Sequence, residues 1–283
     1  MALFSNQATL TYNGNSTNSN VVYGEILEAL TVGKTAVEGS YTPGDVVTYA
    51  VSFRNTGGAL TALTVTDDLG AYTVGTGTAV PLTYVDGSAL FFVEGAQVAT
   101  PVVTAGPPLV FTGVNLPAGA SAVLIYQATV NTFANPDSGG VITNTVTVSG
   151  GGLTAPVSAS ETVPAATMPL LSIFKSITPN TVIDNDSITY TFLVQNTGNE
   201  PITATDDAVI TDTFNPILNA LTVTYNGTVW VEGTDYTYDA TTGVFATLPG
   251  NLVIPAATYT QDPVTGAYTV TPGVATLTVS GTV

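Results

Sequence analysis

The sequence contains neither cysteine nor histidine. Without cysteine, no disulfide can tie the chain together and no thiolate can act as a nucleophile. Without histidine, the chain lacks the commonest general base and the commonest transition-metal ligand. These two absences argue against an enzyme, and we expect neither a metal site nor a cofactor.

Positive charge is almost as scarce. The 283 residues include 3 Lys and Arg against 20 Asp and Glu, which gives a formal net charge of -17, and only 8% of the residues are charged. A chain without a basic patch cannot neutralise phosphates, so we expect no nucleic-acid partner.

Long apolar runs are missing too. A membrane-spanning helix needs about 20 consecutive apolar residues, and no such run occurs, so we expect no membrane insertion. The start, MALFSNQ, lacks the basic and apolar segments of a secretory signal, so the export route stays open.

What the chain does have is many short segments that alternate with period two and are rich in Val, Thr, Ile, Tyr and Phe. Examples are VVTYAVSF (46–53), LTVTD (63–67), AVLIYQATV (122–130) and ITYTFLVQ (188–195). Period-two alternation is typical of strands with one buried face, and Gly and Pro separate the segments as turn residues. The pattern predicts an all-β, immunoglobulin-like sandwich.

A long internal repeat organises these strands. LTVGKTAVEGSYTPGDVVTYAVSFRNTG (30–57) matches LSIFKSITPNTVIDNDSITYTFLVQNTG (171–198), and LTVTDDL (63–69) matches VITDTF (209–214). The repeat predicts two tandem sandwich domains. We expect a first domain over 28–163, a Pro- and Ala-rich linker over 164–169, a second domain over 170–283, and a separate segment over 1–27.

The two copies are not equally complete. The first copy continues into VITNTVTVSG (141–150) and one further strand, whereas the second copy has no such pair. The segment FSNQATLTY (4–12) resembles VITNTVTVSG but stands at the other end of the chain. We therefore expect the N-terminal strands to complete the second domain of a neighbouring subunit by donor-strand addition, a contact that does not close and so propagates a filament. The expected donor residues are Phe4, Asn6, Ala8, Leu10 and Tyr12 on one strand face, and Val22 on the second strand.

The two lysines lie on strand faces that the alternation assigns to the core. Lys34 is in phase with Leu30 and Val32, and Lys175 is in phase with Leu171 and Ile173. The same parity turns other polar residues inward, namely Asp67 and Asn144 in the first copy, Asp212 in the second copy, and Asn6 on the donor strand.

Lysine, aspartate and asparagine on inward faces are the groups that an isopeptide bond requires. A desolvated lysine loses its proton more easily, and a buried protonated carboxyl can polarise an amide. We expect one bond from Lys34 to Asn144, assisted by Asp67, and a second from Lys175 to Asn6 of the next subunit, assisted by Asp212. The alternative is a buried Lys–Asp ion pair with the asparagine as a hydrogen-bond partner.

At these residues the sequence resembles a known family. Lys34, TPGDVVTYAVSFRNTG (42–57), TVTD (64–67) and ITNTVTV (142–148) resemble the bacterial surface-repeat family called domain of unknown function eleven, and are similar to isopeptide-forming pilin domains. The resemblance implies sandwich domains in surface or fibre proteins. The second copy departs from it, since Asn185-Asp186 stands where the first copy has Gly44-Asp45.

Together these features predict a structural subunit of an extracellular homopolymeric filament, such as a pilus or appendage, on a cell or spore surface. Its partner is a second copy of itself, joined head to tail, and any host or surface receptor is unknown. The alternative is a surface adhesin or ligand-binding module of a bacterial cell.

Overall fold

The structure is a computed structural model that describes residues 2–26 and 28–283. Every regular element in these ranges is a β-strand except η1 (Ala204–Asp206), a single turn of 3-10 helix. The prediction of an all-β sandwich protein is therefore confirmed. No helix in the described ranges has the length and apolar character to cross a membrane. Apart from short stretches, one compact unit ends at Pro164 and the other begins at Ala165.

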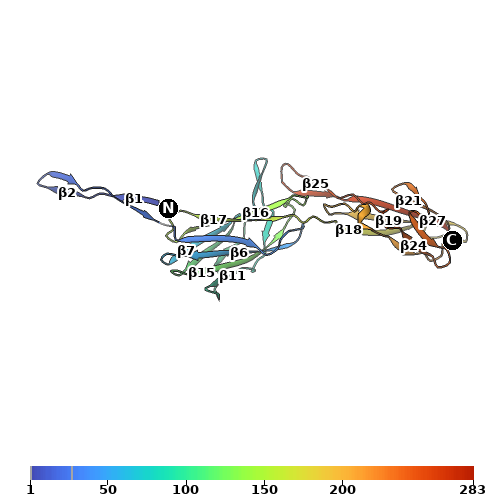
Figure 1. The fold of residues 1–283 in the computed structure, drawn as a ribbon, viewed down its shortest axis with the longest axis horizontal. Coiled ribbons are helices and arrows are strands. Elements are labelled where there is room, and N and C mark those ends of the chain that lie inside the picture. The colour runs from blue at the N-terminus through green and yellow to red at the C-terminus, as the bar shows by residue number, and fades with distance from the viewer. Residues whose placement is uncertain (1, 27) are drawn as a thin grey trace. The chain divides into compact units, whose positions relative to one another are not determined.

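The first unit is a sandwich of two antiparallel sheets (Figure 1). One sheet has the order β12-β11-β15-β6-β5, with β10 paired to β15, and the other has the order β13-β14-β7-β16-β17. The strands of the first sheet are β5 (Leu30–Ala36), β6 (Val46–Asn55), β10 (Leu82–Tyr84), β11 (Leu90–Val93), β12 (Ala96–Val98) and β15 (Ser121–Val130). Those of the second are β7 (Leu60–Asp67), β13 (Val102–Thr104), β14 (Leu109–Leu116), β16 (Val141–Gly150) and β17 (Val157–Pro164); β8 (Tyr72–Val74) and β9 (Gly77–Ala79) form a separate hairpin.

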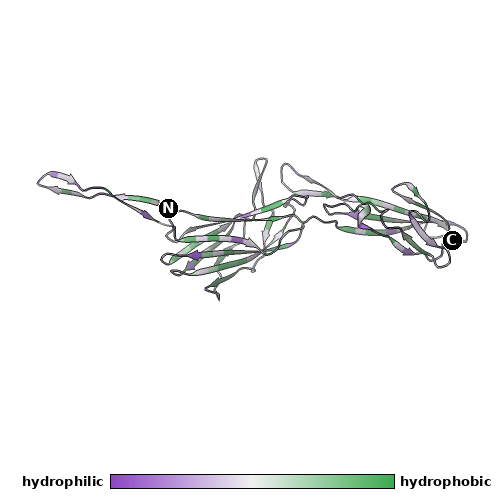
Figure 2. Ribbon diagram, viewed as in Figure 1, coloured by the Kyte–Doolittle hydropathy of each residue, from purple (hydrophilic) through white to green (hydrophobic). Residues whose placement is uncertain are grey.

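The core of the first unit lies between these sheets. Alternate residues along β6, β7, β15 and β16 are buried, as the period-two pattern predicts. Figure 2 shows hydrophobic and hydrophilic residues interspersed along the strands of this unit. Each large apolar side chain that folding buries contributes roughly 1.5–3 kcal/mol. Buried polar residues lie in the same core, namely Lys34 on β5, Asn55 on β6, Asp67 on β7 and Asn144 on β16.

The second unit repeats this plan with fewer strands. A five-stranded sheet has the order β18-β19-β27-β21-β22, and a three-stranded sheet has the order β20-β24-β23. The strands are β18 (Leu171–Thr178), β19 (Ser187–Asn196), β20 (Thr211–Thr213), β21 (Asn219–Tyr225), β22 (Thr228–Trp230), β23 (Tyr236–Asp239), β24 (Val244–Thr247) and β27 (Gly273–Thr282), with a hairpin of β25 (Thr258–Gln261) and β26 (Tyr268–Thr271). Its core includes Phe214, Phe245, Leu277 and Val279.

The Asn-Thr-Gly motif at the end of β6 and of β19 makes the same contacts in both units. The Asn55 side chain donates to the carbonyls of Gly58 and Pro117 and accepts from Gly57 N. Asn196 has the same role at the end of β19, where its side-chain oxygen accepts a hydrogen bond from Gly198 N. Because each amide satisfies otherwise free backbone groups at a buried corner, the motif fixes the turn that follows the strand.

The units differ at one sheet edge. In the first unit β7 lies between β14 and β16, and β16 is followed by β17. Its counterpart β20 pairs with β24, and no described strand of the second unit pairs with the opposite edge of β20. The second unit therefore has no counterparts of β16 and β17 among the described residues.

The N-terminal segment is a hairpin in two parts. β1 (Ala2–Asn6) pairs with β4 (Val22–Ile26), and β2 (Thr9–Tyr12) pairs with β3 (Asn15–Asn18). Asn13 and Gly14 form the turn with positive φ values of 42° and 80°, the conformation for which Asn-Gly is favoured in tight hairpins. Between Asn6 and Thr9 the returning side has one residue more (19–21 against 7–8), which is a β-bulge.

This bulge corrects one expectation. The donor face predicted as a single strand over 4–12 is two strands, separated at Gln7 and Ala8. Ser19 bridges the break, since its hydroxyl accepts from Ala8 N and its carbonyl accepts from the Gln7 amide. All residues from 3 to 23 are exposed, including the hydrophobic side chains of Leu3, Phe4, Leu10, Tyr12, Val22 and Tyr23.

Candidate functional site

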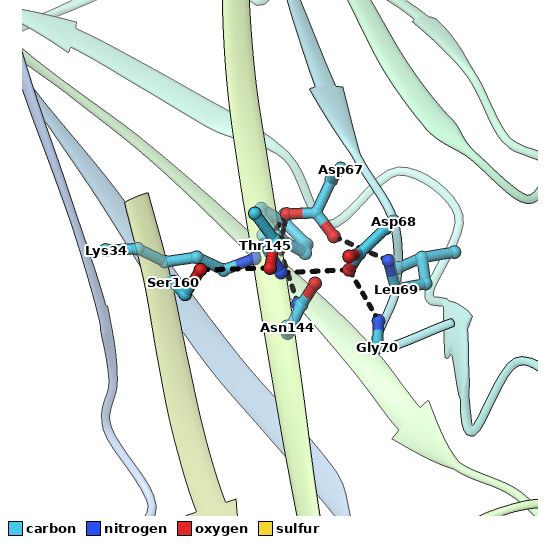
Figure 3. A network of polar contacts seen from close by, with 9 residues as sticks. Lys34, Asp67, Asp68, Leu69, Gly70, Asn144, Thr145 and Ser160 are labelled. Carbon is cyan, nitrogen blue, oxygen red and sulfur yellow. Dashed lines mark hydrogen bonds and ion pairs between the residues drawn. The ribbon is translucent and has the colours of Figure 1, made fainter. Parts of the chain in front are cut away.

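Three strands of the first unit bring a buried lysine, carboxyl and amide together (Figure 3). Lys34 comes from β5, Asp67 from the end of β7 and Asn144 from β16. Lys34 Nζ lies 2.5 Å from Asp67 Oδ2, and neither side chain is accessible to solvent. The second carboxyl oxygen of Asp67 accepts from Leu69 N at 3.0 Å, which fixes the orientation of the carboxyl group.

A fourth residue, Tyr126 on β15, completes this cluster. Its hydroxyl donates to Asp67 Oδ2 at 2.5 Å and accepts from Asn144 Nδ2 at 3.2 Å. Its ring stacks on Tyr49 of β6 with centroids 5.6 Å apart. Tyr126 was not among the predicted site residues, although it lies in phase with the buried Leu124 and Ala128, which is the signal that identified the lysines.

Two polar atoms of the cluster have no partner. Asn144 Oδ1 and the Tyr49 hydroxyl are the buried side-chain polar atoms in the described structure that make no hydrogen bond. A buried polar group without a partner costs about 1–3 kcal/mol. The amide of Asn144 is therefore held through its nitrogen, which donates to Tyr126, while its carbonyl oxygen makes no hydrogen bond.

The surroundings shift the proton affinity of the lysine and of both tyrosines. Burial lowers the pKa of Lys34, and Asp67 opposes that shift as ion-pair and hydrogen-bond partner. Burial also raises the pKa of Tyr49 and of Tyr126. A lysine with a lowered pKa more readily presents a neutral amine, whose lone pair is a nucleophile. The cluster therefore brings a lysine, a carboxyl group and an amide together in the buried core.

The second unit repeats part of this cluster in an open form. Lys175 of β18 and Asp212 of β20 form an ion pair, but the Lys175 side chain is 40% exposed. The Lys175 ammonium lies 4.5 Å from the ring centroid of Tyr190, as Lys34 lies 4.8 Å from that of Tyr49. In the first unit the amide comes from β16, for which the described second unit has no counterpart. The pair is therefore present without an amide partner.

Exposed apolar side chains on β18 flank the lysine of this open pair. Leu171 is 48% exposed, whereas Leu30 at the same register position on β5 is 3% exposed. Ile173 and Ile177, on the same strand face, are also exposed. In the first unit β17 lies against β5 and closes that edge of the sandwich. Exposed apolar stripes beside unpaired strand edges mark sites of association.

The predicted site residues thus fall into three groups. The structure brings Lys34, Asp67 and Asn144 into one cluster, with Asn144 connected through Tyr126 rather than directly to the lysine. It pairs Lys175 with Asp212. The third group lies at exposed positions of the N-terminal hairpin and consists of Phe4, Asn6, Ala8, Leu10, Tyr12 and Val22. Contact of this group with Lys175 of another subunit stays a prediction.

Comparison with known proteins gives fold-level similarity only. No protein-family profile and no curated protein matches the chain. Among solved structures, it is similar to domains D2 and D3 of the major pilin SpaD from Corynebacterium diphtheriae, with 12% identity, a TM-score of 0.36, and coverage of 60% of this chain and 71% of that one. It is also similar to the pilus backbone RrgB from Streptococcus pneumoniae, with 12% identity, a TM-score of 0.34, and coverage of 86% and 55%.

A third similar structure is ACE19, the collagen-binding subdomain of the Enterococcus faecalis surface protein ACE. It has 6% identity and a TM-score of 0.32, and the match covers 50% of this chain and 99% of that one. Identities and TM-scores this low assign neither a family nor a function, and the family named above as a resemblance is not established by them.

Proposed function

We propose that the chain is a structural subunit that polymerises head to tail into an extracellular filament on a cell or spore surface. The observation that carries this proposal is the uncovered face of β18 together with the open Lys175–Asp212 pair. The first unit has β16, β17 and Asn144 at the same place, so the two units differ by one strand pair and one amide.

The N-terminal hairpin of a neighbouring subunit is the proposed occupant. The first half of the hairpin, residues 4–12, resembles β16 in sequence. The register of β16 in the first unit therefore suggests how this half would align with β20. Asp67 lies opposite Val146 in the ladder of β7 and β16. The same alignment puts Ala8 opposite Asp212, with Asn6 in the place of Asn144. The returning strand β4 then covers β18 as β17 covers β5.

A covalent lock between subunits follows from the same alignment. We propose that Lys34 Nζ attacks Cγ of Asn144 and that ammonia leaves, so an amide ties β5 to β16. Lys175 reacts with Asn6 of the next subunit in the same way. The buried Lys34–Asp67 pair supports this chemistry, since burial lowers the pKa of the lysine. The alternative is an ion pair that never reacts, in which case strand burial alone holds the filament.

Electron microscopy of the purified chain tests the polymer. The intact chain is expected to form filaments, and a variant without residues 2–26 is expected to stay dispersed with a folded first unit, because 3–23 contribute no buried residue to that unit. Moving residues 2–26 behind Val283 through a Gly-Ser linker is expected to complete the second unit in the same chain and give monomers.

A matched control separates self-completion from a general effect of the added segment. The same rearranged chain with Leu10→Asp cannot bury the hairpin face, because an unpaired carboxylate is costly to bury, so its second unit is expected to stay open. Filaments formed by the variant without residues 2–26 contradict donor-strand addition. Dispersed monomers of the intact chain contradict the filament and favour the surface adhesin instead.

A further inference from the structure

Four atoms of the first-unit cluster form a continuous chain of contacts from one nitrogen to another. Lys34 Nζ lies 2.5 Å from Asp67 Oδ2, Asp67 Oδ2 accepts from the Tyr126 hydroxyl at 2.5 Å, and that hydroxyl accepts from Asn144 Nδ2 at 3.2 Å. If an amide bond forms here, the first nitrogen is the attacking group and the last is the leaving group.

We propose that Tyr126 is a catalytic residue that relays a proton from Lys34 to the departing nitrogen of Asn144. This inference rests on the Lys34–Asn144 bond proposed above. It adds a fourth residue to the lysine, the carboxyl and the amide. The relay is needed because the amide nitrogen leaves as ammonia, which requires one proton more than the amide carries, and because the cluster is closed to solvent.

The protons balance within the cluster. Asp67 first takes a proton from the Lys34 ammonium, which leaves a neutral amine and a neutral acid. The amine attacks Cγ of Asn144, and a new carbon–nitrogen bond forms. The Asp67 O–H donates to the Tyr126 oxygen, which frees the phenol proton for Nδ2, and the bond from Cγ to Nδ2 breaks.

The attacking nitrogen returns one proton to Asp67 in the same step. The products are one secondary amide and one ammonia, with Tyr126 protonated as at the start and Asp67 changed from a carboxylate to a neutral acid. A proton has moved from Lys34 to Nδ2 through two oxygens, and neither solvent nor any co-reactant takes part. Tyr126 therefore acts as general acid toward the leaving group, a role worth typically 10²–10⁴-fold in rate.

The described second unit has no hydroxyl at the position of Tyr126. Tyr126 lies opposite Tyr49 in the ladder of β6 and β15, and the residue opposite Tyr190 in the ladder of β19 and β27 is Val279. The ring of Phe214 stacks on Tyr190 with centroids 5.0 Å apart, so an aromatic ring is retained without the oxygen. The relay thus distinguishes the bond within a subunit from the bond between subunits.

The test is the rate of ammonia loss in full-length chains that also carry Lys175→Ala, so that Lys34 is the only lysine able to react. Chains are made in a cell-free system and their intact mass is followed under denaturing conditions. The parent chain is expected to lose one ammonia soon after synthesis, whereas Tyr126→Phe is expected to lose it about 10²-fold more slowly or not at all. Tyr84→Phe is the matched control, since Tyr84 packs 6.5 Å from the Tyr126 ring but stands outside the relay.

Folding is checked against Asn144→Ala, which cannot form the bond whatever its rate. If the Tyr126→Phe variant resists proteolysis as well as the Asn144→Ala variant but loses ammonia slowly, the result supports the relay. Should Tyr126→Phe fail to fold, chains made with 3-fluorotyrosine keep the ring and change the acidity of the phenol, and an unchanged rate then overturns the relay.

Three further results have distinct meanings. Loss of ammonia from Tyr126→Phe at the parent rate overturns the relay and leaves the bond intact. Equal slowing by Tyr84→Phe also overturns it, because the effect then belongs to aromatic packing. A parent chain that never loses ammonia refutes the bond itself, and with it the relay, while the filament is judged separately by microscopy.

Discussion

Replacing Leu10 by alanine tests donor-strand docking with a magnitude that follows from the structure. Leu10 is 63% exposed on the hairpin, whereas Val148, with which it aligns on β16, is completely buried. Full burial of a leucine contributes roughly 1.5–3 kcal/mol, so docking that buries the exposed two-thirds contributes about 1–2 kcal/mol. Truncation to alanine loses most of this contribution, and a cavity adds to the loss.

The expected effect is a change in the concentration at which filaments form. A loss of 1.4 kcal/mol is tenfold in an equilibrium constant, so Leu10→Ala is expected to raise the critical concentration about tenfold or somewhat more. The measurement is sedimentation of filaments over a dilution series in the Lys175→Ala background, because a covalent lock would hide the equilibrium. Stability of the first unit is expected to be unchanged.

Thr11→Ala is the control for this experiment. Thr11 is adjacent on β2 and its side chain points to the opposite face of the strand, so its truncation is expected to leave the critical concentration within about twofold. Equal critical concentrations for Leu10→Ala and Thr11→Ala refute the reasoning, since the hairpin then does not bury the face that the sequence assigns to it.

Three further outcomes are expected. Asn6→Ala is expected to form filaments that dissolve to monomers in hot detergent, where the intact chain leaves a ladder of multimers on a denaturing gel; a ladder from Asn6→Ala contradicts the proposed partner of Lys175. In Asn144→Ala, Lys34 cannot react and its pKa stays below the ordinary 10.5, so the unfolded chain binds more protons than the folded one. Its free energy of unfolding should therefore rise with pH up to about pH 10, relative to Asn144→Ala with Lys34→Met, and a flat difference in urea unfolding contradicts a lowered pKa. The bond within the subunit is expected to be complete in intact-mass spectra before multimers appear on gels, because the second site lacks the Tyr126 hydroxyl.

Several features of the fold followed from local pattern alone. Period-two alternation identifies strands because successive side chains point to opposite faces, and this pattern gave β6, β7, β15 and β19 close to their observed bounds. The repeat of Asn-Thr-Gly at 55–57 and 196–198 predicted two similar units, since the same residues at the same strand ends make the same contacts. The same alternation also predicted that Lys34 and Asp67 face the core.

Alternation along a strand predicts which face of the sheet a residue lies on. It does not predict which residues of the opposite sheet the side chain contacts. The contact of Tyr126 with Asp67 and Asn144 depends on how β15 packs across from β7 and β16, which no local pattern records. The break at Gln7 and Ala8 is likewise a matter of pairing, because a bulge arises when two strands of unequal length share one hairpin.

The sequence by itself determined the strands, the repeat and the inward direction of both lysines, because these depend on residues near one another in the chain. Only the tertiary structure decided that Lys34 is buried against its hydrogen-bond partner Asp67, whereas Lys175 lies open beside an apolar stripe. The physical reason is that burial and proton affinity are set by strands that come from distant parts of the chain. Leu171 is exposed where Leu30 is buried because no described strand covers β18 as β17 covers β5.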